Sequence, residues 1–186
     1  MRKPAPVLRA HWRRETRCAY LAAFAERNRS ATIVEPIFGD QSEGSNMTLK
    51  IHSGSCHCGA VRFEAEIDIA QGTVKCNCSS CAKARSWLTI VPASRYRLTS
   101  GAESQANYQW TPPGKPQPTI EFHFCKICGI RTPGRGEMEA MGGAFYAVQV
   151  PLLNAIDLEE LAAGPIQYVD GLHDRFDREP ADKRFL

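Results

Sequence analysis

The sequence of 186 residues contains no long hydrophobic run. No stretch approaches the roughly 18 consecutive apolar residues of a membrane-spanning helix, so we expect a soluble protein without a membrane anchor. The N-terminal region also lacks the apolar segment of a secretory signal, because its longest apolar stretch, residues 20–25, is too short and too far from the start. These two absences favour a cytoplasmic location.

The sequence also carries little net charge, and that charge is unevenly distributed. Residues 1–46 hold eight Lys or Arg and five Asp or Glu, so the whole net charge of +3 lies there and residues 47–186 are neutral overall. Proteins that bind nucleic acid usually carry a basic stripe on the folded domain. The neutral charge of residues 47–186 therefore predicts no nucleic-acid partner.

The character of the sequence changes at Met47. Residues 1–46 are rich in scattered arginines and end in an irregular Ser/Glu/Gly-rich stretch, and they are expected to be a disordered extension or to precede a mis-assigned start. The second interpretation rests on the Glu-Gly dipeptide just before Met47, whose codons resemble a bacterial ribosome-binding site. Peptides from upstream of Met47 in a mass spectrum of the native protein would exclude it. An Arg-rich targeting peptide is a third interpretation, weakened by Glu15 and Glu26.

Residues 47–186 are expected to form one domain with a C-terminal tail from about residue 165, because 43% of the sequence is hydrophobic, enough for one core. Short alternating segments predict strands, at residues 48–53, 60–67, 72–77, 86–91, 96–99, 107–110, 119–124 and 143–150. Short helical turns are predicted at residues 151–154 and 157–163, the second beginning at Asp157 as its N-cap. Many short strands with few helices indicate a mostly-β domain.

Cysteines are the most informative residues of the sequence. Seven of the eight fall in three clusters, namely Cys56 and Cys58, Cys76, Cys78 and Cys81, and Cys125 and Cys128. Without a secretion signal, such spacing indicates metal binding before disulfides. A disulfide between cysteines one residue apart would close a small strained ring, whereas two such thiolates can bind one ion.

Zinc binding divides these cysteines into four and three, because structural zinc sites close all four tetrahedral positions and catalytic sites leave one open. The first and third clusters lie beside glycines that permit the tight turn of a zinc knuckle. We therefore expect one structural zinc, bound by Cys56, Cys58, Cys125 and Cys128.

The middle cluster supplies three thiolates from one turn, and no fourth cysteine lies nearby in the sequence. We expect Cys76, Cys78 and Cys81 to bind a second zinc whose fourth position is open to water or substrate. A zinc with three thiolates activates water poorly but can bind and deprotonate a thiol. The predicted chemistry is the making or breaking of a carbon–sulfur bond.

Two other interpretations of the middle cluster remain open, an iron–sulfur cluster and a structural zinc closed by a histidine. The nearby histidines are His57 and His123, and we expect neither to be a ligand. Arg131 and Arg135 could pair with a substrate carboxylate, although solvated arginines fit the sequence better. Residues 173–177 resemble a metal-binding segment, but a polar tail wrapped over the sheet is the favoured interpretation.

Three segments are distinctive, namely GSCHCGAVRF at residues 54–63, CNCSSC at residues 76–81 and FCKICG at residues 124–129. Together they resemble the glutathione-dependent formaldehyde-activating enzyme family, which also includes centromere protein V. The resemblance runs from about residue 52 to residue 147 and does not extend to residues 1–46.

The resemblance implies an Mss4-like β-tent of short antiparallel sheets stapled by zinc. It implies two zinc ions per chain, a structural one on Cys56, Cys58, Cys125 and Cys128 and an active-site one on Cys76, Cys78 and Cys81. The family activity joins glutathione and formaldehyde to give S-(hydroxymethyl)glutathione, classed as a carbon–sulfur lyase reaction. The alternative is a non-catalytic, zinc-stabilised module of the Mss4-like class that binds another protein. The sequence indicates neither the general base nor the oligomeric state.

Overall fold

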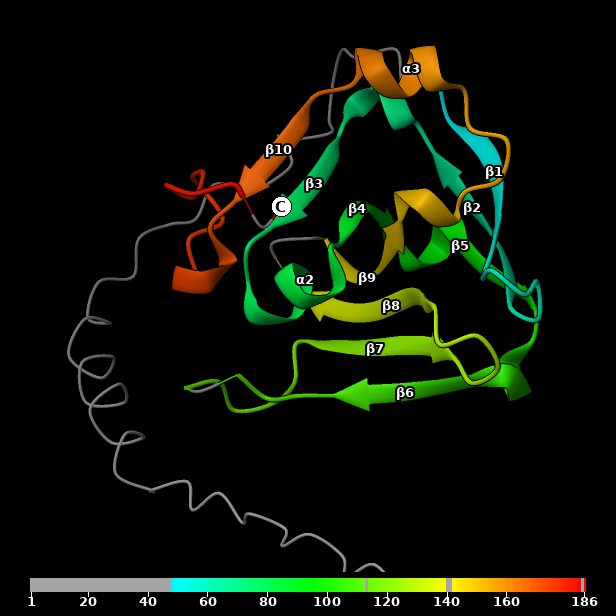
Figure 1. Cartoon of the computed structure of the whole chain (residues 1–186), viewed down its shortest axis with the longest axis horizontal. Helices are drawn as coiled ribbons and strands as arrows, with labels where there is room; N and C mark the ends of the chain where they lie inside the picture. The colour runs from blue at the N-terminus through cyan, green and yellow to red at the C-terminus, as the bar shows by residue number, and fades with distance from the viewer. Residues whose placement is uncertain (1–47, 113, 140–141, 185) are drawn as a thin grey trace, which may run out of the picture. The chain divides into compact units, whose positions relative to one another are not determined.

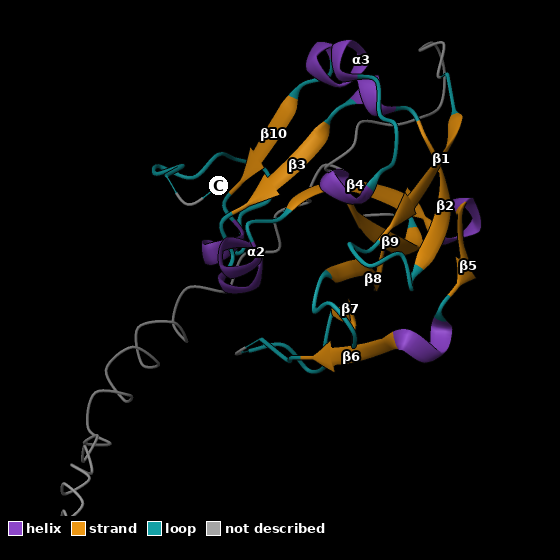
Figure 2. Ribbon diagram, turned by 45° about the vertical axis from the view of Figure 1, so that its right-hand side comes forward, coloured by secondary structure: helices purple, strands orange, loops and turns teal. Residues whose placement is uncertain are grey.

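The computed structural model describes residues 48–112, 114–139, 142–184 and 186, so the expectations for residues 1–46 lie outside it. Within these residues, ten strands form two sheets and two short α-helices lie beside them (Figures 1 and 2). This confirms the mostly-β fold predicted from the short alternating segments. No helix among the described residues is long and apolar enough to cross a membrane.

The elements follow one another along the chain as β1 (Lys50–Ser55), β2 (Arg62–Ile67), β3 (Thr73–Cys76), α2 (Ser79–Ala84), β4 (Trp87–Pro92), β5 (Tyr96–Ser100), β6 (Gln105–Gln109), β7 (Ile120–Cys125), β8 (Arg131–Met138), β9 (Gly143–Gln149), α3 (Leu158–Ala163) and β10 (Ile166–Val169). The predicted strands correspond to β1–β7 and β9, with ends that differ by a few residues. Helix α2 and strands β8 and β10 were not predicted from the sequence.

The strands form a small sheet and a large one. The small sheet has the order β1-β2-β5, and the large sheet has the order β10-β3-β4-β9-β8-β7-β6. Neighbouring strands are antiparallel except β10 and β3, which pair in parallel with Val169 opposite Cys76. This pairing brings the end of β10 to the end of β3, where the CNCSSC segment begins.

The main hydrophobic core lies between the small sheet and one face of the large sheet. Alternate residues from Val61 through Ile67 are buried, as the strand pattern predicted, and those of β2 pack against Val91 and Val148 of the large sheet. Helix α3 covers part of this core through Leu161. Its N-cap is Asp157, as predicted, because the Asp157 carboxylate accepts two backbone N–H groups of the first turn.

The other face of the large sheet carries a second apolar cluster. Its buried residues are Leu88, Phe145 and Ala147, and Cys81 of α2 packs against them. Gly136 makes room for the ring of Phe145, because a Cβ at Gly136 would lie 2.3 Å from a ring carbon. Because Cys81 packs against this cluster, helix α2 lies on this face of the sheet, in front of β8 and β9 in the view of Figure 1.

Candidate metal centres

The structure brings the seven clustered cysteines into two separate groups. We call Cys56, Cys58, Cys125 and Cys128 the four-cysteine group, and Cys76, Cys78 and Cys81 the three-cysteine group. Within each group the sulfur atoms lie within 4.8 Å of one another, and all seven thiols are free. Both groups could hold a metal ion. The division is the one expected from the sequence, whereas the role of each cysteine as a ligand remains a prediction.

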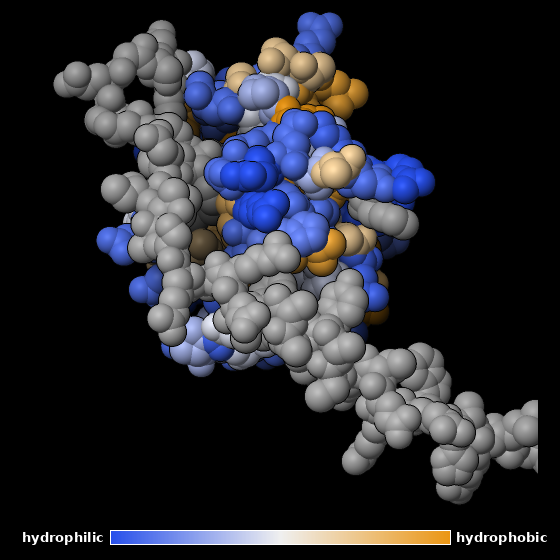
Figure 3. Space-filling view, turned by 90° about the vertical axis from the view of Figure 1, so that its left-hand side faces the viewer, coloured by the Kyte–Doolittle hydropathy of each residue, from blue (hydrophilic) through white to orange (hydrophobic). Residues whose placement is uncertain are grey.

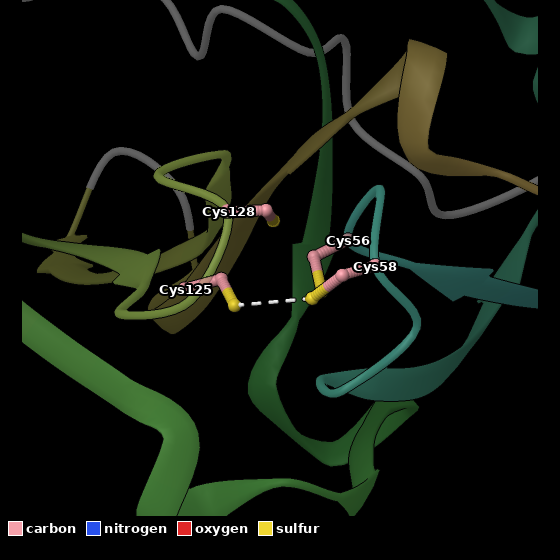
Figure 4. Close-up of side chains that lie close together, drawn as sticks. All are labelled: Cys56, Cys58, Cys125 and Cys128. Carbon is pink, nitrogen blue, oxygen red and sulfur yellow. Dashed lines mark hydrogen bonds between the residues drawn. The ribbon is translucent and has the colours of Figure 1, made fainter.

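The four-cysteine group joins the two sheets. Cys56 and Cys58 lie in the turn after β1, and they face Cys125, the last residue of β7, and Cys128 in the turn that follows (Figure 4). The sulfur of Cys58 lies 3.6 Å from that of Cys56 and 3.7 Å from that of Cys125. Zinc–sulfur bonds of about 2.3 Å place the corners of a tetrahedron about 3.8 Å apart, whereas disulfide sulfurs lie about 2.05 Å apart. The spacing therefore fits four thiolates around one ion.

Both turns have the local structure of a knuckle. Gly59 and Gly129 each adopt a φ of +73°, which favours glycine. The N–H of Gly59 donates to the carbonyl of Cys56 at 3.0 Å, and the N–H of Gly129 donates to that of Cys125 at 2.8 Å. The turn after β1 is one residue shorter than the turn after β7, but the same kind of hydrogen bond from a glycine N–H to a cysteine carbonyl closes both. Two segments that are distant in the sequence therefore hold their cysteines in similar turns.

Backbone N–H groups around the four-cysteine group stabilise thiolates. The N–H of Val61 donates to the Cys56 sulfur at 3.3 Å. The backbone N–H of Cys58, followed by that of Ile130, lowers the pKa of Cys128 to about 6. Because Cys56 and Cys125 are almost completely buried, several thiolates together would need a cation to balance their charge. The donor set thus fits a metal ion.

The three-cysteine group is built where β3 passes into α2. Cys76 ends β3, Cys78 is the N-cap of α2, and Cys81 lies in its first turn. The Cys76 sulfur accepts the N–H of Cys78 at 3.4 Å, and the Cys78 sulfur accepts the N–H of Cys81 at 3.5 Å. A short helix that begins within CNCSSC therefore turns all three sulfurs toward one point.

The thiols of the three-cysteine group differ in pKa. The neighbouring thiols of Cys76 and Cys81 lower the pKa of Cys78 to about 2. The neighbouring Cys78 sulfur in turn raises the pKa of Cys76 to about 11, and burial adds to this effect. One thiolate is thus favoured in the protein alone, and a bound cation would supply the charge that the other two need in order to ionise.

No His, Asp, Glu or further Cys in the described ranges brings a ligand atom to the three sulfurs. The ring of His123 is engaged elsewhere, since Nδ1 lies 2.9 Å from the Pro133 carbonyl oxygen and Nε2 lies 2.7 Å from the Glu121 carboxylate. His57 is exposed in the turn of the four-cysteine group and belongs to neither group. Neither histidine belongs to a cysteine group, and the expectation that neither is a ligand stays a prediction.

The segment after β10 packs against the three-cysteine group (Figures 1 and 2). The side-chain amide of Asn77 donates to the Asp170 carboxylate at 2.7 Å and accepts the N–H of Leu172 at 2.8 Å. Phe176 packs against an apolar cluster whose buried residues are Val74, Cys76 and Val169. From the sequence we expected a polar tail over the sheet and did not predict this contact, which brings Gly171 close to the Cys76 sulfur.

Gly171 provides a prediction for this contact. A Cβ at Gly171 would lie 2.5 Å from the Cys76 sulfur and 3.2 Å from Cβ of Cys78. We expect Gly171→Ala to displace the Cys76 sulfur and to lower the metal content of the purified protein by one ion per chain, measured by plasma mass spectrometry. Leu172→Ala is the control, because Leu172 is exposed and its N–H is unchanged. A Gly171→Ala protein with the wild-type metal content would contradict the close approach.

This chain is similar to proteins that are already known. A crystal structure of a Rhodobacter sphaeroides protein is similar to this chain, with 29% sequence identity over 62% of this chain and 99% of that one and a TM-score of 0.49. The model of one protein family, described as glutathione-dependent formaldehyde-activating enzyme, matches residues 51–167. Because this match covers more than half of the chain and includes both cysteine groups, the chain belongs to the glutathione-dependent formaldehyde-activating enzyme family.

Proposed function

We propose that this protein is a zinc-dependent enzyme of the carbon–sulfur lyase type, which joins glutathione or a related thiol to formaldehyde and reverses that reaction. The proposal rests on one observation: three converging sulfurs in a group that no fourth ligand among the described residues completes. The family name supports glutathione and formaldehyde as the substrates. Reduced thiols as ligands and as substrate suit a cytoplasmic location.

Zinc is the ion that best suits both groups. All donors are thiolates, and the sulfur separations of 3.6 and 3.7 Å in the four-cysteine group match a tetrahedral zinc. An iron–sulfur cluster distributes its cysteines over several irons, whereas the sulfurs of the three-cysteine group lie within 4.8 Å of one another. We assign a structural zinc to the four-cysteine group and an open-site zinc to the three-cysteine group.

The open site would favour the reactive form of the thiol substrate. Zinc, when bound there, supplies a position for a thiol and lowers its pKa, so that a nucleophilic thiolate persists at neutral pH. Cys76, Cys78 and Cys81 hold this position, and the backbone N–H groups of Cys78 and Cys81 fix two of the sulfurs. Figure 3 shows the side of the molecule that lies on the left in Figure 1, and the described residues in view there are mostly hydrophilic.

The proposed reaction needs no oxidant and releases no leaving group. The thiolate sulfur attacks the carbonyl carbon of formaldehyde and forms the carbon–sulfur bond. The π electrons of the carbonyl pass to its oxygen, which takes up the proton that the thiol gave up. The product is S-(hydroxymethyl)glutathione, and the reverse reaction returns the same atoms.

Exchange spectroscopy by NMR tests this proposal directly. Glutathione, formaldehyde and their adduct interconvert without a catalyst, and we expect the protein to increase the exchange rate in proportion to its concentration. The Cys78→Ser variant is the control, because it should lose only the zinc of the three-cysteine group and keep the fold. Exchange rates equal to the uncatalysed value at every protein concentration would contradict the enzyme and favour the non-catalytic, protein-binding alternative.

A further inference from the structure

We propose that Arg131 binds a carboxylate of the thiol substrate and so selects carboxylate-bearing thiols over uncharged ones. This inference deepens the proposed function and depends on it, because it places the substrate thiol at the three-cysteine group. It commits the site to a substrate class, namely small thiols that carry an anionic group within reach of their sulfur.

Arg131 is fixed beside the three-cysteine group by two contacts. One terminal nitrogen of its guanidinium donates to the Ser80 hydroxyl at 3.0 Å, and Ser80 lies between Cys78 and Cys81 in the chain. The guanidinium carbon lies 4.4 Å from the centroid of the Phe122 ring. Stacking on an aromatic ring orients a guanidinium without using its hydrogen-bond donors.

The charge of Arg131 has no acidic partner among the ion pairs of the described residues. Its side chain is half-buried, and a partly desolvated cation is costly unless it is paired. Ser80 occupies one of the five N–H donors that a guanidinium offers. The planar fork of an arginine suits two-point binding of a carboxylate. A pre-oriented, unpaired guanidinium next to the open site is therefore suited to a carboxylate of the substrate.

A β-bulge separates Arg131 from Arg135. Residues four apart on a regular strand share a face, but the register of β7 and β8 shifts between Glu121 and His123. Arg131 pairs with Phe124, whereas Arg135 pairs with Glu121, three residues earlier on β7. Since residues three apart on a strand face opposite sides, Arg135 points away from α2, and it is exposed. Arg135 is thus a matched control on the same strand.

Calorimetric titration of the zinc-loaded protein tests the inference. We compare the wild type, Arg131→Gln, Arg131→Lys and Arg135→Gln, each titrated with glutathione, glutathione diethyl ester and 2-mercaptoethanol. Loss of a charged hydrogen-bonded pair predicts that Arg131→Gln weakens glutathione binding by about 10- to 100-fold. The affinity of Arg131→Gln for the ester and for 2-mercaptoethanol should change less than about 3-fold. The glutathione affinity of Arg131→Lys should lie between those of Arg131→Gln and the wild type. The glutathione affinity of Arg135→Gln should equal that of the wild type.

Two outcomes would overturn the inference while the proposed function stands. One is wild-type glutathione affinity in Arg131→Gln. The other is an equal loss of affinity for all three thiols, which would mean that Arg131 only holds α2 in place through Ser80. If Arg131→Gln does not fold, as judged by circular dichroism and zinc content, Arg131→Lys carries the test with the same criterion of selective loss. A wild-type protein that binds no thiol would instead contradict the proposed function itself, and this inference with it.

Discussion

Replacing Cys125 with serine is expected to unfold the domain. Cys125 is completely buried and belongs to the group that joins the small sheet to the large one. Structural zinc contributes about 10–16 kcal/mol in small zinc domains, whereas a whole domain is stable by about 5–15 kcal/mol. If the four-cysteine group holds a structural zinc as proposed, its loss can therefore exceed the entire free energy of unfolding. Thermal unfolding followed by circular dichroism should show no cooperative transition in Cys125→Ser.

Ile127→Ser is the matched control for this prediction. Ile127 lies in the same turn between the two cysteines, but its side chain is largely exposed, so its loss should change the melting temperature little. A Cys125→Ser protein with a wild-type melting temperature would show that the four-cysteine group does not stabilise the fold.

Replacing Cys78 with serine is expected to abolish thiol-dependent turnover while the fold persists. The main core and the four-cysteine group contain no residue of the three-cysteine group, so both should remain intact. Changing residues that only support a metal ligand commonly costs 10- to 100-fold in activity, and we expect loss of a ligand to cost more than about 100-fold. The measurements are the NMR exchange rate, the zinc content, which should fall by one ion per chain, and the melting temperature.

Ser79→Ala is the control for Cys78→Ser, because Ser79 is the exposed residue next to it. It should retain the exchange rate and zinc content of the wild type. Wild-type exchange rates in Cys78→Ser would contradict catalysis at the three-cysteine group. Global unfolding of Cys78→Ser would instead assign that group a structural role.

The features that the sequence predicted are those that local patterns determine. Alternation of apolar residues predicted β2, because every second residue from Val61 to Ile67 faces the core. The capping chemistry of Asp157 predicted the start of α3 in the same way. Cysteine spacing predicted which cysteines lie together, since each knuckle is a short turn that glycine closes.

The features that the sequence did not predict depend on contacts between distant segments. Strand β8 was missed because its consecutive buried residues Thr132, Pro133 and Gly134 show no alternation. The short α2 has no apolar periodicity, and its position comes from packing against the large sheet. The contact between Gly171 and Cys76 arises from the parallel pairing of β10 with β3.

The two arginines show the same distinction. Both were expected to be solvated, and Arg135 is exposed as expected. Arg131 differs, because the β-bulge turns it toward α2, where it stacks on Phe122 and donates to Ser80. A register shift between two strands leaves no signal in either strand's own sequence.

X-ray absorption at the zinc edge tests the central claim, the open position of the three-cysteine group, most directly. If each of the two cysteine groups binds one zinc ion as proposed, seven sulfur ligands for two ions give an expected value of about 3.5 sulfur neighbours per zinc at about 2.3 Å. Saturating glutathione should raise this number to about 4, whereas S-methylglutathione, which has no free thiol, should leave it unchanged. Four sulfur neighbours per zinc before any thiol is added, or no increase with glutathione, would contradict the claim.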